Sequence, residues 1–117
     1  MNKIIKILLL SVLTLSMTSK SGYTNEKIKI GLLIPLTGKN SDIGQSIINS
    51  TRLAINKINN MSIEVIPKDT KSDPNTTLRS AKELSELGVK IIIGPVFHSN
   101  LEYLDELKEI TFLSFTN

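Results

Sequence analysis

Apolar and polar residues alternate in blocks along most of the chain, and each block predicts one strand or one helix. Short runs that are almost entirely apolar predict strands at 27–34, 63–66, 89–93 and 110–115. Apolar residues that recur about every 3.6 positions predict helices at 43–58, 74–87 and 100–108. Continuous apolar runs are typical of strands buried on both faces of a parallel sheet. The pattern therefore predicts an α/β fold, a parallel sheet with helices on both faces and right-handed crossovers.

Capping residues and helix breakers set the limits of the first elements. Ser41 or Asp42 is placed to cap the first helix, because serine and aspartate side chains accept hydrogen bonds from the free amides of a helix start. The asparagine pair at 59–60 is expected to end this helix, whose predicted buried stripe is Ile47, Ile48, Thr51, Ala54, Ile55 and Ile58. Pro67 is expected to end the second strand, because proline has no backbone N–H to donate.

The second and third helices carry clearer start signals. Asp73 followed by Pro74 predicts an N-cap and a first helical residue, and Gly88 suits the left-handed position just past the helix end. Ser99 and Glu102 have the spacing of a capping box, in which each side chain bonds to the backbone amide of the other residue. We therefore expect Ser99 to cap the third helix.

The expected strand order is 2-1-3-4, which places the topological switch point between the first and third strands. Ligands of parallel α/β sheets bind there, beyond the carboxyl ends of the strands. The loops that follow those two strands, 37–42 and 95–99, are polar and open helices, whose partially positive starts attract a carboxylate. The predicted ligand-binding residues are Ser41, His98, Ser99, Thr116 and Asn117.

The N-terminal segment has the pattern of a secretory signal peptide. Lys3 and Lys6 precede an apolar run at 7–15, and small and polar residues follow. The run is shorter than the roughly 20 residues that a membrane span requires, and a buried N-terminal helix is the alternative interpretation. We predict that residues 1–24 are a signal peptide with two candidate cleavage sites near its end. The mature domain, 25–117, is then expected in the periplasm.

Composition narrows the choice of partners. The chain has 14 basic and 11 acidic residues, but three of the lysines lie in the first 24 residues, so the remainder carries equal numbers of both. This balance predicts neither a nucleic-acid partner nor binding to an anionic membrane surface. The sequence contains no cysteine, so it offers no disulfide and no site for the lipid of a bacterial lipoprotein. We therefore expect no stable membrane anchor.

Candidate catalytic and metal-binding residues are few. His98 is the single histidine and has no cysteine partners for a metal ion, so it is expected to pack toward Tyr103 or to contact a ligand. Gly38-Lys39 lacks the flanking glycine and hydroxyl residue of a phosphate-binding loop. Asp69 and Asp73 could act as paired carboxylates, but a turn and a helix cap explain them more simply. Because no nucleophile and base form a set, we expect neither an enzyme nor a cofactor.

Five motifs occur in register along the predicted domain. They are Pro-Leu-Thr-Gly at 35–38, Gly44 at the helix start, Ala-Ile-Asn-Lys-Ile-Asn at 54–59, Lys-Ser-Asp-Pro-Asn at 71–75 with Asp69 before it, and Ile-Ile-Gly-Pro at 92–95. With these motifs, residues 27–117 resemble the N-terminal part of the first lobe of type 1 periplasmic binding proteins, the leucine-isoleucine-valine-binding group. Members of that family are several times longer, so the resemblance implies a truncated or fragmentary chain.

The resemblance also implies a function. Proteins of this family have two lobes around a cleft, and a solute bound between the lobes passes to the permease of an ABC importer. For this chain the resemblance implies a non-enzymatic protein that binds an amino acid or a similar small polar solute. The family offers a small hydroxyl residue where this chain has His98, and Ser99 follows one position later. The ligand contact at His98 therefore departs from the family pattern.

A second interpretation comes from a different class of protein. The segments Gly-Pro-Val-Phe-His-Ser-Asn-Leu-Glu at 94–102 and Leu-Ser-Phe-Thr-Asn at 113–117 also resemble the lipoprotein activators of penicillin-binding proteins. Those proteins share the fold and act by contacting a peptidoglycan synthase rather than by carrying a solute. Their anchoring requires a lipid-bearing cysteine, which this sequence lacks, so solute binding is the first hypothesis.

Overall fold

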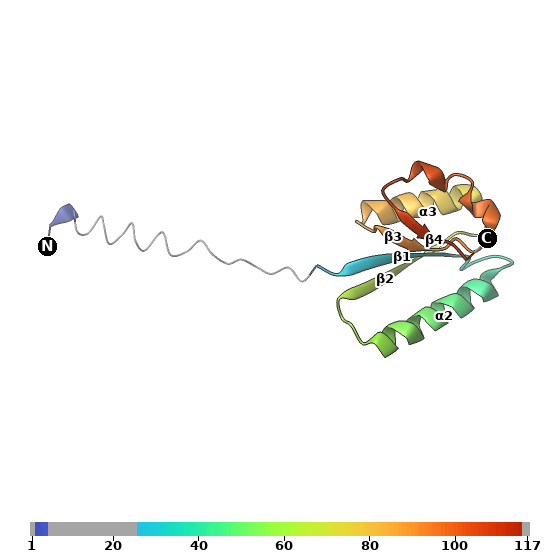
Figure 1. The fold of residues 1–117 in the computed structure, drawn as a ribbon, viewed down its shortest axis with the longest axis horizontal. Helices are drawn as coiled ribbons and strands as arrows, with labels where there is room; N and C mark the ends of the chain where they lie inside the picture. Colours follow the sequence, from blue (N-terminus) through green and yellow to red (C-terminus); the bar gives the residue numbers. More distant parts are fainter. Residues whose placement is uncertain (1, 5–25, 116–117) are drawn as a thin grey trace.

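The order of strands and helices follows the predicted alternation (Figure 1). The computed structural model describes residues 2–4 and 26–115, so most of the predicted signal peptide, 1–24, lies outside the described residues. The elements are β1 (Ile28–Ile34), α2 (Ser41–Ile58), β2 (Ile63–Asp69), α3 (Pro74–Glu86), β3 (Ile91–Ile93), the 3-10 helices η1 (His98–Leu101) and η2 (Leu104–Glu106), and β4 (Thr111–Leu113).

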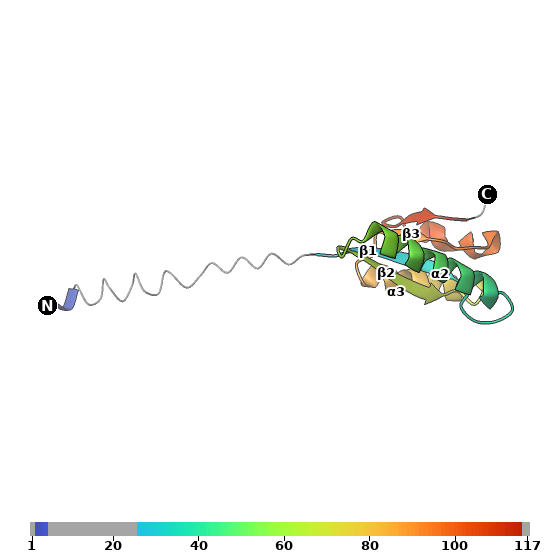
Figure 2. The same ribbon diagram turned by 90° about the horizontal axis from the view of Figure 1, so that it is seen from below.

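The described strands form one parallel sheet in the order β2-β1-β3-β4, which confirms the predicted strand order. β1 lies inside the sheet, and its Ile30 is in register with Val65 of β2 on one side and with Ile91 of β3 on the other. Helix α2 covers one face of the sheet, whereas α3 lies on the opposite face (Figures 1 and 2). The predicted α/β fold with helices on both faces is therefore confirmed.

The main core lies between the sheet and α3. Its buried side chains come from β1, α3, β3, η2 and the segments that join them: Leu33, Ala81, Leu84, Val89, Ile92, Leu104 and Ile110. Gly31 of β1 permits this packing, because a Cβ atom there would lie 2.7 Å from Cδ1 of Leu84. Leu32 and Leu33 point to opposite faces of the sheet, and both are fully buried. β1 is thus the strand buried on both faces that its apolar run predicts.

Helix α2 packs less tightly than α3. Within α2 only Gly44 is buried, and a Cβ atom there would lie 1.9 Å from the carbonyl oxygen of Pro35. Glycine therefore lets the helix start directly against the end of β1. The predicted stripe along the helix is half-buried at four positions, and it is exposed at Ala54 and Ile58. The closest approach of α2 to the sheet is thus at its N-terminal end, next to the loop that follows β1.

The prediction of a third α-helix at 100–108 is wrong. The chain forms two short 3-10 helices there, and the N-cap position of η1 is Phe97 rather than Ser99. Leu101, Leu104 and Leu107 recur every three residues, which matches the 3.0 residues per turn of a 3-10 helix better than the 3.6 of an α-helix. All three leucines pack into or against the core. Burial of the side that carries them therefore favours the 3-10 helix over the α-helix.

Other boundaries also differ from the prediction. β3 is Ile91–Ile93 rather than 89–93, and β4 is Thr111–Leu113 rather than 110–115. β2 continues through Pro67 to Asp69, because β2 is an edge strand and proline is tolerated where one side of a strand is unpaired. Helix α2 begins at Ser41, so neither Ser41 nor Asp42 is its cap. Asn40 occupies the N-cap position and makes no side-chain cap bond.

The signals around α3 and at the end of α2 are confirmed. The carboxylate of Asp73 accepts a hydrogen bond from the amide of Thr76 at 2.7 Å, and Pro74 is the first helical residue. Gly88 follows α3 with a positive φ of 83°, which glycine adopts without strain. Asn59 ends α2 in the left-handed conformation, with φ 49°. The local sequence signals at these three positions therefore predict the helix ends correctly.

Ile92 and Ile93 give a matched pair for testing the core. Ile92 is fully buried in the cluster between the sheet and α3, whereas Ile93 is half-buried and lines a hollow beside α2. We expect Ile92→Ala to lower the free energy of unfolding by about 2–5 kcal/mol, because it leaves a cavity in the core. Ile93→Ala should cost clearly less, because solvent already reaches its side chain. Urea unfolding measures both losses, and equal losses would contradict the assignment of the two faces.

Candidate functional site

Parallel strands end at one edge of the sheet, and the predicted ligand loops lie at that edge. Ser41 begins α2 after the loop that follows β1, and His98 begins η1 after the loop that follows β3. β1 and β3 are neighbours, yet the chain leaves them toward opposite faces of the sheet (Figure 1). This is the geometry of a topological switch point, where α/β sheets bind ligands. The other two predicted ligand residues, Thr116 and Asn117, lie outside the described residues.

His98 and Ser99 lie together in a surface hollow of about 400 Å³, whose other lining residues are Leu101, Glu102 and Asp105. Both predicted side chains are exposed, and the hydroxyl of Ser99 makes only a long contact of 3.5 Å with Oδ1 of Asn100. The two carboxylates of the hollow favour a cationic group there over an anion. Ser41 does not line this hollow, so the structure brings two of the predicted residues together and leaves the third apart.

The loop after β1 is held by a residue that the sequence assigns only to a turn. Asp69 ends β2, and its carboxylate accepts hydrogen bonds from the amide of Leu36 at 2.9 Å and from the hydroxyl of Thr37 at 2.6 Å. It also accepts from the amides of Lys71, at 2.9 Å, and Thr37, at 3.4 Å. Burial alone would raise the pKa of Asp69, but these hydrogen bonds outweigh it and lower the pKa below its ordinary value. The carboxylate is therefore charged at neutral pH.

A second polar contact joins the same two loops. The side-chain amide of Asn40 donates a hydrogen bond to the hydroxyl of Ser72 at 3.0 Å, one residue before α2 begins. Lys71 and Ser72 have left-handed backbone conformations, with φ 51° and 58°, which residues other than glycine adopt only where surrounding contacts hold them. The loops after β1 and β2 are thus tied together at two points, and Ser41 follows directly on the second.

Sequence reasoning places loop 37–42 at this edge, but it misses the side-chain contacts that Thr37 and Asn40 make there and the part played by Ser72. The turn predicted at Asp69 exists, because the amide of Lys71 donates to its carboxylate. Its contacts with the loop after β1, in contrast, join residues more than 30 positions apart. The signal that could reveal them is the register of β1 and β2, which sets Ile34 and Asp69 side by side at the strand ends.

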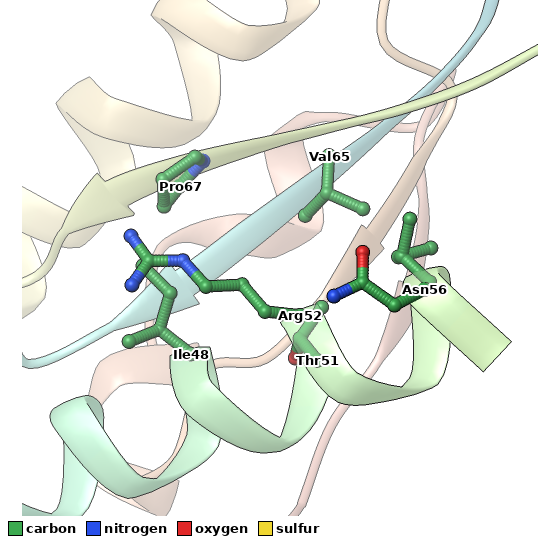
Figure 3. A pocket seen from close by; sticks show the side chains of 7 residues that line it. Ile48, Thr51, Arg52, Asn56, Val65 and Pro67 are labelled. Atoms are coloured by element: carbon green, nitrogen blue, oxygen red, sulfur yellow. The ribbon is translucent and has the colours of Figure 1, made fainter. Parts of the chain in front are cut away.

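A separate hollow lies between α2 and β2 (Figure 3). Its volume is about 410 Å³, and its lining residues are Ile48, Thr51, Arg52, Ile55, Asn56, Val65 and Pro67. Figure 3 shows the side chain of Arg52 extending from α2 toward Pro67. None of the predicted ligand-binding residues lines this hollow, which runs along the helix rather than beyond the strand ends.

The described parts of the chain, residues 2–4 and 26–115, contain neither a metal-binding cluster nor a membrane-spanning helix. No group of three or more metal-ligating side chains is arranged there to hold an ion. No helix in these ranges combines the length and the apolar character that crossing a membrane requires.

Known proteins resemble this chain over nearly all of its described length. A family model described as "Periplasmic binding protein" matches residues 27–115. An uncharacterized protein of Methanocaldococcus jannaschii is 29% identical over 87 residues, which cover 68% of this chain and 21% of that protein. The chain therefore spans about a fifth of the length of this curated relative.

Three solved structures share the fold. The solute binding protein of an ABC transporter from Rhodopseudomonas palustris BisB5, in complex with 3,4-dihydroxybenzoic acid, is 29% identical with a TM-score of 0.70, over 76% of this chain and 27% of that one. The branched-chain amino acid transporter substrate binding protein LivJ from Streptococcus pneumoniae, in complex with isoleucine, is 23% identical with a TM-score of 0.67. The match covers 75% of this chain and 28% of LivJ. LpoA from Haemophilus influenzae is 24% identical with a TM-score of 0.63, over 75% of this chain and 16% of LpoA. The likeness to LivJ and to LpoA shows the fold alone.

The sequence predicts both Asp73 and Ser99 as helix caps, and in the structure only Asp73 forms one. We expect Asp73→Ala to lower the free energy of unfolding by about 1 kcal/mol, because the amide of Thr76 loses its acceptor. Ser99→Ala should change it by less than about 0.5 kcal/mol, because the exposed hydroxyl caps nothing. Urea unfolding of both variants tests this difference. A loss at Ser99 as large as that at Asp73 would count against the position of Ser99 inside η1.

Proposed function

Because the chain belongs to the periplasmic binding protein family, we propose that it supplies the first ligand-binding loops of an extracytoplasmic solute-binding protein. In this proposal the solute is an amino acid or a similar small polar molecule. The protein acts in the periplasm after export, delivers the solute to the permease of an ABC importer and catalyses no reaction.

The switch point between β1 and β3 is the observation that carries this proposal. The two strands are neighbours, and the loops after them lead into α2 on one face and toward η1 and α3 on the other. Ser41 follows the first loop, and His98 and Ser99 follow the second. A ligand at this edge would therefore meet the start of α2 and hydroxyl groups from both loops.

The polar groups of this edge suit a ligand with both a carboxylate and an ammonium group. The start of α2 is partially positive, and the hydroxyl of Ser41 can donate a hydrogen bond to a carboxylate. Glu102 and Asp105, which share a hollow with Ser99, offer negative charge to an ammonium group. The ligand of the solute-binding protein that is 29% identical, 3,4-dihydroxybenzoic acid, carries a carboxylate. An ammonium group beside that carboxylate would meet the charges of Glu102 and Asp105, which supports an α-amino acid as the ligand class.

Titration with L-isoleucine, followed by backbone amide NMR, tests the proposal. We expect chemical-shift changes at 37–41 and at 98–99, with a dissociation constant in the millimolar range, because the chain spans only about a quarter of the solved solute-binding relative. A millimolar constant corresponds to about 4 kcal/mol of binding free energy. 2-Methylbutylamine, which is isoleucine without its carboxylate, is the matched control ligand and should bind more weakly at 37–41.

Two serine variants sharpen this test. Ser41→Ala should weaken isoleucine binding by roughly tenfold, as expected for one lost hydrogen bond to a carboxylate. Ser50→Ala is the control, because Ser50 is another serine of α2, and its hydroxyl bonds to the carbonyl of Ser46, away from the loop. Shift changes confined to the hollow along α2 and β2, or equal losses in both variants, would contradict the assignment of the ligand edge.

Activation of a penicillin-binding protein is the alternative that the sequence raises. The C-domain of LpoA is described as a regulator of PBP1A, but the likeness to LpoA supports only the fold, which the solute-binding proteins share. No feature of the described residues favours contact with a synthase over binding of a solute. Solute binding therefore remains the proposed function.

A further inference from the structure

The candidate binding edge contains a loop that packing does not hold. Residues 37–39, between β1 and α2, are exposed, and nothing lies within 4 Å of where a Cβ atom of Gly38 would be. The loop makes one turn bond of its own, from the amide of Ser41 to the carbonyl of Gly38 at 3.2 Å. Its remaining hydrogen bonds at the β1 end all go to the carboxylate of Asp69. At its β1 end, the shape of this loop therefore depends on one side chain.

Asp69 is itself held in place by the sheet and by α3. It is in register with Ile34 at the end of β1, and its carbonyl oxygen accepts a hydrogen bond from the hydroxyl of Ser80 at 3.0 Å. The next residue, Thr70, is only 1% exposed and donates its amide to the carbonyl of Ile34 at 2.9 Å. A carboxylate fixed on a strand end and braced by a helix is a rigid support for a loop.

From this geometry we propose that Asp69 is a positioning residue, which holds loop 36–40 in the shape that presents the start of α2 to the ligand. In this role Asp69 acts through the loop rather than on the ligand, since its oxygens accept hydrogen bonds from Leu36, Thr37 and Lys71. The bond between Asn40 and Ser72 fixes the far end of the same loop. The inference rests on the proposed function for the identity of the ligand. The effect of Asp69 on the loop can be measured without any ligand.

Four variants separate this role from a contribution to folding alone. Asp69→Ala removes every hydrogen bond to the carboxylate, and Thr37→Val removes only the one from the hydroxyl while keeping the shape of the side chain. Asp69→Asn keeps one oxygen acceptor and offers an amide group to the hydroxyl of Thr37. It should therefore keep part of the hydrogen bonding that Asp69→Ala loses. Asp73→Asn is the matched control, because Asp73 lies four residues later and bonds to its own helix.

Amide hydrogen exchange at Leu36 and Thr37 measures directly how firmly the carboxylate of Asp69 holds the loop. We expect exchange at Leu36 to become at least about tenfold faster in Asp69→Ala, as the loss of a hydrogen bond to a charged group implies. The increase should be smaller in Asp69→Asn and Thr37→Val and absent in Asp73→Asn. Unchanged exchange at Leu36, or an equal acceleration at Ile92 in the core, would overturn the proposal. If Asp69→Ala does not fold, the two conservative variants decide the question by the same criteria.

Binding of L-isoleucine gives the second measurement. Asp69→Ala and Thr37→Val should bind it several-fold more weakly than the wild type, and Asp73→Asn should bind it equally well. Variants that loosen the loop yet bind isoleucine as the wild type does would overturn the positioning role. A wild type that binds no isoleucine would contradict the proposed ligand class, while the exchange rates would still decide whether Asp69 holds the loop.

Discussion

Burial of β1 on both faces is the constraint on which the rest of the structure depends. Leu32, Leu33 and Ile34 are fully buried, and β1 pairs with β2 on one side and with β3 on the other. A strand of this kind needs helices on both faces, so the chain must cross over the sheet in both directions. Two glycines make this possible, because neither has a side chain. Gly31 of β1 leaves room for Leu84 of α3, and Gly44 of α2 leaves room for Pro35, the residue that follows β1.

The same constraint creates the candidate site. Because β2 runs parallel to β1 and in register with it, Asp69 reaches the strand end just where the chain turns from β1 toward α2. The loop at this turn is exposed, and a charged carboxylate bonds to it more strongly than a neutral acceptor would. Hydrophobic burial therefore places the loop, and polar contacts give it its shape. The helix start that follows is then oriented toward the edge shared with β3.

Features that depend on neighbouring residues could be predicted from the sequence, and features that depend on tertiary contacts could not. The apolar runs predict all the described strands, and Asp73-Pro74 predicts the start of α3, because these signals are local. The strand order follows instead from the general topology of parallel α/β sheets. The 3-10 helices could not be predicted, because leucines three residues apart fit both an α-helix and a 3-10 helix. Only the packing of these leucines on the core favours the tighter helix. Pro67 stays in a strand because only the sheet order reveals an edge. The contacts of Asp69 with Leu36 and Thr37 likewise require the register of two strands.

Membership of the periplasmic binding protein family and the switch point between β1 and β3 lead to one central claim, that a small solute binds beyond the carboxyl ends of these strands. Nuclear Overhauser contacts between ¹³C-labelled L-isoleucine and the backbone amides of the chain test this claim most directly. The account predicts contacts at Ser41 and at Ser99. Contacts at Ile48 and Ile55, in the hollow along α2, or at Lys27 and Lys90, at the opposite edge of the sheet, would contradict it.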